Sequence, residues 1–260
     1  MPISHDLKTI FIHIPKNAGE SIEKALGIYG DVSRENFWGV INNQHILQHF
    51  TANKLRLQKQ ISKNWHEYFK FAVIRNPWSK AVSEYNWYLR YGPTIPFYEW
   101  VNSLEYRIQI NNSIHVLEVG HNLEQYKFVY DDNDNLIVDR LIRFENLEAE
   151  FSLLCSQKKW EVELLHASTT ASNVDVPFYE YYDKVTALKI SKIYARDIEK
   201  FGYNIEETFS SHTLKEKPVE LGEFFDEKLY LDANPDVKSA GVDAFQHYLN
   251  HGIREQRKLR

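Results

Sequence analysis

The stretch TIFIHIPKNAGES, residues 9–21, joins an apolar run to a loop that carries a lysine and a glycine. Residues 8–14 are rich in β-forming side chains and end at Pro15, and residues 21–26 have the composition of a short helix that Gly27 stops. This order predicts a strand, a tight loop and a helix. Because the backbone N–H groups at the start of such a helix attract anions, the stretch predicts an anion-binding loop.

A second unit of the same kind begins at residues 68–74, a strand-like run that closes on Arg75-Asn76-Pro77. Asn76 is a good N-cap and Pro77 a good first residue of a helix, which Gly92-Pro93 would end. One apolar stripe of that helix, expected to face the sheet, consists of Trp78, Val82, Tyr85 and Leu89. Repeated strand-to-helix units predict an α/β fold with a central, mainly parallel sheet flanked by helices, whose ligands gather at the carboxyl ends of the strands.

The pattern changes between residues 125 and 144. Two β-like runs, residues 126–130 and 136–144, are joined by the acidic link 131–135, which predicts a hairpin. The link lacks the glycine and the distal glutamate of a calcium-binding EF-hand loop, so a solvated turn is favoured. Residues 145–157 and 178–200 are predicted to be helical.

The composition divides the chain into two parts. Residues 1–208 form the predicted main domain, residues 209–222 a polar linker, and residues 223–260 a small C-terminal helical module. Four aromatic residues of that module are expected to form a small core rather than a sugar-binding platform: Phe225, Tyr230, Phe245 and Tyr248.

The composition also limits the class of protein. With 260 residues, 43% of them apolar, the chain can bury a substantial core. A net charge of −5 argues against general nucleic-acid binding. No apolar segment reaches the length of a membrane span, and the N-terminal residues lack the basic region and long hydrophobic segment of a signal peptide. The only cysteine, Cys155, lies in an apolar stretch typical of a core. These features predict a cytoplasmic protein without a disulfide framework.

The two strand-end loops carry the residues that suit phosphate groups. Lys16 supplies a mobile positive charge, Gly19 permits close approach of the backbone, and Ser21 can donate a hydroxyl. Because no Gly-Lys-Ser/Thr ending follows, the first loop is not a Walker A sequence and gives no support for Mg²⁺-dependent ATP hydrolysis. Arg75 and Ser83 could hold a further phosphate. Each element alone also fits a plain structural role, Lys16 on a surface turn and Arg75 paired with a carboxylate.

The two loops together resemble those of the carbohydrate-type sulfotransferases that use 3′-phosphoadenosine 5′-phosphosulfate (PAPS), in particular a bacterial-type member of the group containing heparan 2-O-sulfotransferase. Residues 13–21 resemble the family's 5′-phosphosulfate loop, and residues 71–85 resemble its 3′-phosphate element. Residues 141–147 and 181–203 add two further similarities in the expected order. The tail from residue 225 onward resembles a short module attached to bacterial glycan-modifying enzymes.

The resemblance implies a three-layer P-loop-like fold and transfer of a sulfuryl group from PAPS to a hydroxyl, with 3′-phosphoadenosine 5′-phosphate (PAP) as product. Lys16 would contact the bridging oxygen, where negative charge grows as the sulfuryl group leaves. Arg75 and Ser83 would hold the 3′-phosphate. The backbone amides that would cradle the 5′-phosphate belong to Asn17, Ala18, Gly19, Glu20 and Ser21. Such a reaction needs positioning, charge neutralisation and a base, and no metal is expected.

The resemblance places a catalytic histidine near His49. An imidazole near its ordinary pKa suits deprotonation of an alcohol at neutral pH. His45 and Glu35 are alternatives, and both histidines could instead be surface or satisfied core residues. Ser168 and Ser172 lie in a stretch that relatives close over the nucleotide.

The expected partners are the nucleotide donor and a hydroxyl acceptor, which is expected to be a carbohydrate. The oligomeric state is left open. Two other functions compete: a nucleotide or sugar kinase with an atypical phosphate loop, and a catalytically silent module that binds a nucleotide or a glycan.

Overall fold

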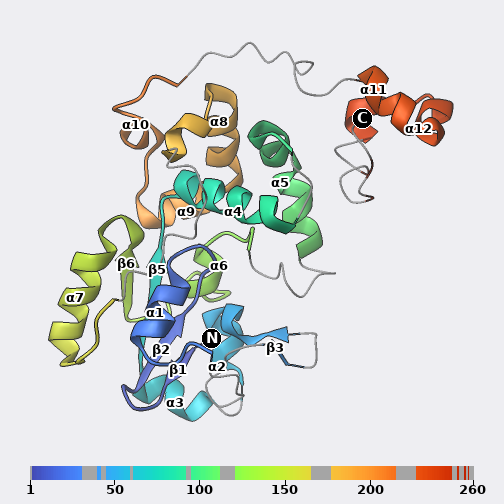
Figure 1. Ribbon diagram of the computed structural model, residues 1–260. Coiled ribbons are helices and arrows are strands. Elements are labelled where there is room, and N and C mark those ends of the chain that lie inside the picture. Colours follow the sequence, from blue (N-terminus) through green and yellow to red (C-terminus); the bar gives the residue numbers. More distant parts are fainter. Residues whose placement is uncertain are drawn as a thin grey trace.

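A four-stranded sheet with strand order β1-β2-β5-β6 is the centre of the computed structural model (Figure 1). The structure describes residues 2–30, 40–41, 45–58, 61–91, 95–111, 121–164, 177–214, 227–247, 251, 255 and 257. The strands of the sheet are β1 (Ile3–Ser4), β2 (Thr9–Ile12), β5 (Phe69–Ile74) and β6 (Arg140–Arg143). Strands β2 and β6 run parallel to β5, whereas β1 pairs antiparallel with β2. The prediction of a mainly parallel sheet is therefore confirmed. A separate pair consists of β3 (Val40–Ile41) and β4 (His45–Ile46).

Helices connect and cover the strands. The α-helices described are α1 (Gly19–Ala25), α2 (Ala52–Arg56), α3 (Ser62–Glu67), α4 (Pro77–Tyr91), α5 (Phe97–Asn111), α6 (Tyr126–Val129), α7 (Leu147–Lys158), α8 (Lys184–Ile193), α9 (Ala195–Phe201), α10 (Ile205–Thr208), α11 (Glu227–Ala233), α12 (Pro235–Ala240) and α13 (Ala244–His247). The short 3₁₀ turns are η1 (Leu47–His49), η2 (Phe144–Asn146) and η3 (Phe178–Tyr181).

The sheet separates two hydrophobic clusters, because alternate residues of a strand point to opposite faces. Ile10 and Ile12 of β2 pack on the face covered by α2, α3 and α6. Phe11 between them packs on the face covered by α1 and α7. The result is a helix–sheet–helix arrangement of three layers (Figure 1). Cys155 of α7 is a buried member of the second cluster, so its predicted place in the core is confirmed.

Helix α4 begins as predicted but faces a different partner. The side-chain oxygen of Asn76 accepts hydrogen bonds from the amides of Trp78 and Ser79, at 3.0 and 3.2 Å, and so caps the helix. Its apolar stripe lies in a third cluster with residues of α5 and α8, and no strand residue of the four-stranded sheet belongs to that cluster. The expectation that the stripe faces the sheet was wrong, because α5 and α8 supply the apolar surface that it buries.

The predicted hairpin is present at its turn, where Tyr130 and Leu136 form an antiparallel bridge, but its first run is not a strand. Residues Tyr126–Val129 form the helix α6, and only the end of the second run forms a strand, β6, which pairs parallel with β5. The carboxylate of Asp197 accepts hydrogen bonds from the amides of Gln125 and Tyr126, at 2.8 Å each. These bonds satisfy the first amides of α6 from a distant part of the chain and favour a helical turn over a strand.

The predicted helix over residues 178–200 is divided. It consists of η3, α8 and α9, and α8 ends at Tyr194, whose backbone leaves the helical range. The buried Tyr194 hydroxyl donates to the carbonyl oxygen of Asn122 at 3.2 Å. This contact ties the break to the segment that precedes α6.

Two side chains that follow α10 pack on earlier parts of the chain. Phe209 is buried against Trp78 and Tyr182, and His212 stacks on Tyr179 with ring centroids 3.2 Å apart. In the C-terminal part, α11, α12 and α13 contact one another, and Tyr230 is the one predicted aromatic whose side chain the structure describes.

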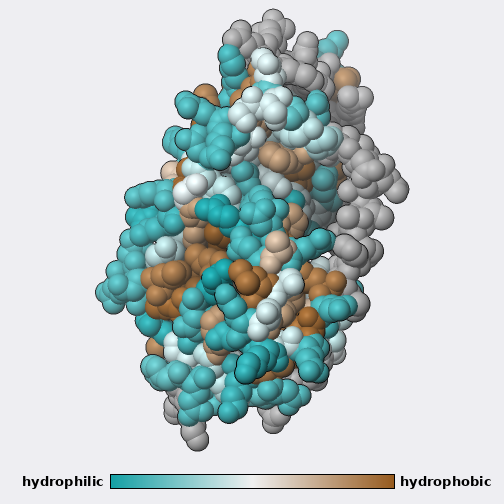
Figure 2. Space-filling view, turned by 90° about the vertical axis from the view of Figure 1, so that its left-hand side faces the viewer, coloured by the Kyte–Doolittle hydropathy of each residue, from teal (hydrophilic) through white to brown (hydrophobic). Residues whose placement is uncertain are grey.

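Figure 2 shows the face of the molecule on which α7 lies, where apolar side chains are exposed between hydrophilic ones. Leu153 of α7 is half exposed, which is ordinary for single apolar residues on a protein surface. Over the part of the chain that the structure describes, none of the helices combines the length and the apolar composition that crossing a membrane requires.

Candidate functional site

The loops after β2 and β5 lie side by side at the carboxyl edge of the sheet. Ile12, the last residue of β2, pairs with Ala72 in the parallel register, and β5 ends two residues further on at Ile74, so both loops begin at the same edge of the sheet. The Nη1 atom of Arg75 donates a hydrogen bond to the carbonyl oxygen of Lys16 at 2.9 Å. The structure thus brings together the two residues that the sequence predicted for the two ends of a nucleotide.

The first loop has an unusual backbone. Lys16 and Ala18 both adopt the left-handed conformation, with φ of 66° and 59°. Ala18 is the N-cap of α1 and provides no side-chain hydrogen bond to the amides that follow. The amide of Asn17, in contrast, donates to the carbonyl oxygen of Ile14 at 3.3 Å. Asn17 was predicted to offer this amide to a phosphate, but the loop itself uses it.

Gly19 is required by a side chain rather than by its own conformation. A Cβ atom at this position would lie 1.9 Å from Nε2 of His13 and within 2.3 Å of two carbons of the same ring. The His13 ring therefore occupies the space beside the start of α1. Its Nδ1 atom forms a short contact with the buried carboxylate of Glu23, one turn further along that helix. From the sequence, Gly19 was expected to permit the close approach of a phosphate. The position of the His13 ring is a second reason for a glycine here.

A glutamine amide holds the two loops together. The side chain of Asn17 is fully buried and donates to the carbonyl oxygen of Val73 at 2.8 Å and to Oε1 of Gln125 at 2.7 Å. Gln125 Oε1 also accepts from the amide of Arg75 at 2.9 Å, and Gln125 Nε2 donates to the Arg75 carbonyl at 2.8 Å. Both loops are thus fixed by one side chain from the segment before α6.

The guanidinium of Arg75 is held in place on three sides. Its Nε donates to Oγ of Ser79 at 2.9 Å, and the group lies 4.0 Å from the centre of the Phe144 ring. Burial lowers the pKa of Arg75 to about 10. The residue stays charged at neutral pH and retains further N–H donors for an anion. Ser83 lies one helical turn beyond Ser79 on α4 and is half-buried.

The remaining residues of the first loop are on the outside of α1. Glu20 is exposed and forms an ion pair with Lys24 at 2.6 Å. This pair, together with the hydrogen bond from Lys24, lowers the pKa of Glu20. Ser21 is half-buried in the first turn of α1. The side chain of Glu20 thus pairs with Lys24, one turn further along the same helix.

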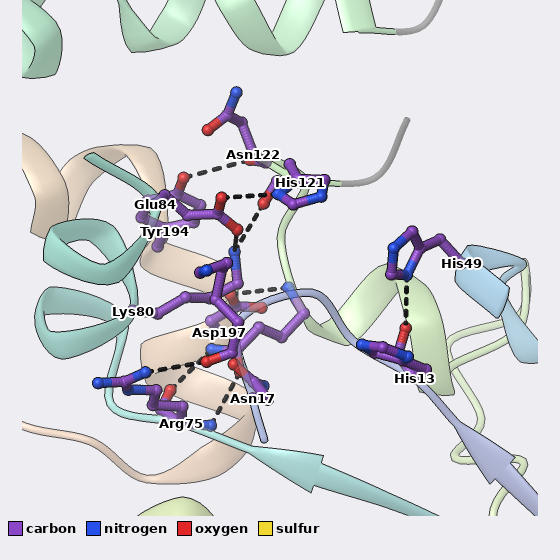
Figure 3. A network of polar contacts seen from close by, with 12 residues as sticks. His13, Asn17, His49, Arg75, Lys80, Glu84, His121, Asn122, Tyr194 and Asp197 are labelled. Atoms are coloured by element: carbon purple, nitrogen blue, oxygen red, sulfur yellow. Dashed lines mark hydrogen bonds and ion pairs between the residues drawn. The ribbon is translucent and has the colours of Figure 1, made fainter. Parts of the chain in front are cut away.

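Three histidine rings lie in a row beside this loop (Figure 3). The ring of His49 contacts the ring of His13 edge to face, with centroids 4.6 Å apart, and that of His121 in the same way at 5.5 Å. Burial lowers the pKa of His49 well below its ordinary value, and the neighbouring histidines add to this effect. The ring of His49 thus differs from the imidazole of ordinary pKa that suits a base at neutral pH, because it is desolvated.

The third histidine belongs to a buried ionic group. His121 Nδ1 lies 2.9 Å from Oε2 of Glu84, and the ring stacks on Trp87 at 4.2 Å. Lys80 donates to Oε1 of Glu84 at 3.0 Å and to the carbonyl oxygen of His121 at 2.7 Å. Despite its burial, the pKa of Glu84 is lowered, chiefly by the charge of Lys80 and by the interaction with His121, with a smaller contribution from Lys16.

Several predicted residues lie outside the described part of the chain. Glu35, Ser168 and Ser172 are among them. His45 is described only through its backbone, as the first residue of β4.

Four residues of the site were not predicted: Ser79, Glu84, His121 and Gln125. The spacing of Lys80 and Glu84, four apart on one helix, is a sequence signal for an ion pair and could have directed attention to this group. No local pattern marks His121 or Gln125, because their partners lie on α4 and in the two loops.

The arrangement offers a cationic loop, a fixed guanidinium and a histidine-rich wall. Among the described residues, no three His, Cys, Asp or Glu side chains are grouped so that they could hold a metal ion. Neutralisation of an anionic donor by Lys16 and Arg75 is the chemistry that the positions of these side chains allow.

Comparison with known proteins gives one match. Neither a curated protein nor a solved structure matches the chain. The model of the sulfotransferase family matches residues 1–204, which include both loops, α4 and the histidine row. The chain therefore belongs to the sulfotransferase family, whose members transfer sulfuryl groups.

Proposed function

We propose that this chain transfers a sulfuryl group from PAPS to a hydroxyl group of a carbohydrate. The observation that carries the proposal is the hydrogen bond between Arg75 Nη1 and the Lys16 carbonyl, at 2.9 Å. This bond fixes the guanidinium of Arg75, the proposed partner of the 3′-phosphate, beside the loop proposed for the 5′-phosphosulfate. A donor with phosphates at both ends of its ribose fits this pair of cations better than a nucleotide with one phosphorylated position.

Each loop has its own role in the proposal. Lys16 neutralises the negative charge that grows on the 5′-phosphate as the bond from sulfur to the bridging oxygen breaks. Arg75 binds the 3′-phosphate through the N–H groups that Ser79 and Lys16 do not use. Ser83, Gly19 and Ser21 stay in the proposed donor site. Because the transition state is loose, positioning and charge neutralisation supply most of the catalysis.

A histidine base completes the proposal, and His49 is the first candidate for it. Its Nδ1 atom lies 3.4 Å from the carbonyl oxygen of His13. A carbonyl can only accept, so this contact needs a proton on Nδ1 and leaves the lone pair on Nε2. The lowered pKa keeps the ring neutral at pH 7, as a base requires. The same burial makes the protonated ring costly, since no carboxylate among the described residues hydrogen-bonds to it.

Titration calorimetry with adenosine 3′,5′-bisphosphate, AMP and Mg·ATP tests the donor. We expect the bisphosphate to bind most tightly and EDTA to have no effect on its affinity. The variants Lys16→Ala and Arg75→Lys should weaken bisphosphate binding, and Arg75→Lys should leave AMP binding nearly unchanged. Lys24→Ala is the matched control, because Lys24 lies on α1 and pairs with Glu20 at the surface. Binding of Mg·ATP in preference to the bisphosphate would favour the kinase alternative.

Release of PAP from PAPS, with a panel of monosaccharides as acceptors, tests the transfer. Turnover that depends on the sugar supports a carbohydrate acceptor. Binding of the bisphosphate without any turnover would instead identify a silent nucleotide-binding module. We further propose the relation to the heparan 2-O-sulfotransferase group and the division into a main domain and a C-terminal module that resembles those of bacterial glycan-modifying enzymes. Expression of residues 1–214 alone, followed by the same binding assay, tests that division.

A further inference from the structure

His121 and Glu84 form a buried pair of the kind that orients a catalytic base. The Glu84 side chain is 2% exposed and that of His121 10% exposed, and Nδ1 lies 2.9 Å from the carboxylate. The charge of Lys80 and the hydrogen bond from His121 keep the pKa of Glu84 low, so the carboxylate is ionised at neutral pH and accepts the proton on Nδ1 of a neutral ring. The Nε2 atom of His121 therefore carries the lone pair. Carboxylate, histidine and an available Nε2 are the components of an activated base.

His49 lacks this support. Its one hydrogen bond in the described structure is the 3.4 Å contact with the His13 carbonyl, which is long for an N–H···O bond. The protonated ring would be desolvated beside two other histidines, and no carboxylate among the described residues hydrogen-bonds to it. His121, in contrast, has an ionised carboxylate to stabilise an imidazolium.

His121 also lines a small pocket. Its wall includes Trp87, Trp100 and Arg107, and its free volume of about 10 Å³ is close to the room that one water needs. One hydroxyl group has nearly the same size. Arg107 supplies N–H donors to the same wall. The pocket suits the hydroxyl end of an acceptor.

Ring contacts and the charge of Lys16 connect the pocket with the first loop. The positive charge of Lys16 is close enough to lower the pKa of Glu84, which lines the same pocket. The His49 ring lies between His13, under the first loop, and His121 (Figure 3). The row of rings thus leads from the donor loop to the pocket.

We propose that His121, oriented by Glu84, is the catalytic base that removes the proton from the acceptor hydroxyl. This inference rests on the proposed function. The hydroxyl oxygen forms a bond to sulfur while the bond from sulfur to the bridging oxygen breaks. The electron pair of the broken bond stays on the bridging oxygen of the 5′-phosphate, beside Lys16. The hydroxyl proton moves to Nε2 of His121. Glu84 touches neither reactant and is a positioning residue, and Lys80 holds Glu84 in its ionised form.

The central test compares His121→Asn with His49→Asn. An asparagine amide can replace the Nδ1 donor of each ring but provides no basic nitrogen. The assay is PAP release from PAPS with the monosaccharide panel, alongside calorimetry with PAP. We expect His121→Asn to lower turnover by about 100-fold or more with PAP affinity unchanged, and His49→Asn to lower it far less. His66→Asn, in the exposed part of α3, is the control. Full turnover in His121→Asn together with loss in His49→Asn would overturn the proposal.

The role of Glu84 is tested by the pH–rate profile. Glu84→Gln leaves the buried Lys80 without its carboxylate and can unfold, so the double variant Lys80→Met/Glu84→Gln is made as well. We expect a lower plateau and an acidic limb that moves to lower pH, because a protonated His121 loses its counter-charge. Among the residues that the structure describes, the other charged or titratable groups beside the ring are His49 of η1 and Arg107 of α5. A profile with an unmoved limb in the folded double variant would refute the positioning role.

A readout without turnover separates this inference from the proposed function. In protein labelled with ¹⁵N-histidine, long-range NMR correlations with PAP present should show the His121 proton on Nδ1. A proton on Nε2 would exclude the ring as the base even if the enzyme transfers sulfuryl groups. If the wild type neither binds PAP nor consumes PAPS, the proposed function and the base fail together.

Discussion

Replacement of Gly19 by alanine should displace the His13 ring. The added Cβ would lie 1.9 Å from Nε2 of His13, and the ring must move by about 1 Å to reach the 3.0 Å that real contacts keep. This movement disturbs the buried contact between His13 and Glu23. Overpacking of a core by one methyl group costs about 1–3 kcal/mol, and Gly→Ala recovers about 0.4–1 kcal/mol of chain entropy. With the weakened ion pair, the net loss of unfolding free energy should be about 2 kcal/mol.

A double-mutant cycle by urea denaturation measures this cost. The reference background carries His13→Ala with Glu23→Gln, so that the ring is absent and no buried carboxylate stays unpaired. There Gly19→Ala should be neutral or stabilising by up to about 1 kcal/mol. The two backgrounds should therefore differ by about 2–3 kcal/mol. An equal cost in both backgrounds would show that the ring is not what excludes a side chain at position 19.

The remaining predictions concern buried polar groups. Burial raises the pKa of Asp197 from 3.8 to about 6, so its contribution to stability is present below pH 4 and is lost as the pH rises through 6. The unfolding free energy of the wild type relative to Asp197→Asn should therefore fall by about 3 kcal/mol between about pH 4 and pH 7, and a difference that does not change with pH would contradict it. Burial raises the pKa of the Cys155 thiol, so a thiol reagent should modify it only as fast as the protein unfolds; rapid reaction of the native protein would exclude its burial. Asn17→Ala leaves the Val73 carbonyl without its donor and should cost about 1–3 kcal/mol in thermal unfolding while weakening PAP binding, whereas unchanged PAP affinity would separate this tether from the donor site.

The sequence predicted those parts of the fold that depend on local chemistry. Asn76 and Pro77 mark the start of α4 because the cap and the first helical residue are adjacent in the chain. The segment Tyr126–Val129 was predicted as a strand because its side chains favour one, and the carboxylate of Asp197 that caps it as a helix comes from α9. A preference of four residues is too weak to resist such a long-range contact.

The residues of the candidate site also fall into those that local sequence predicts and those that depend on long-range packing. Lys16, Gly19 and Arg75 could be predicted because each follows a strand of the sheet, and parallel strands bring their carboxyl ends together. The contact of His121 with Glu84 could not be predicted from the sequence, since it depends on how the segment before α6 packs on α4. Nor does a sequence report desolvation, which lowers the pKa of His49.

The amide of Gln125 has a consequence for the history of this family. It bonds to the side chain of Asn17, which is far away in the sequence, and to both backbone groups of Arg75. A substitution of Asn17 or of Gln125 leaves a buried donor or acceptor of the other residue without its partner. Relatives that have lost one should therefore have replaced both, and positions 17 and 125 should covary even where the rest of the two segments has diverged.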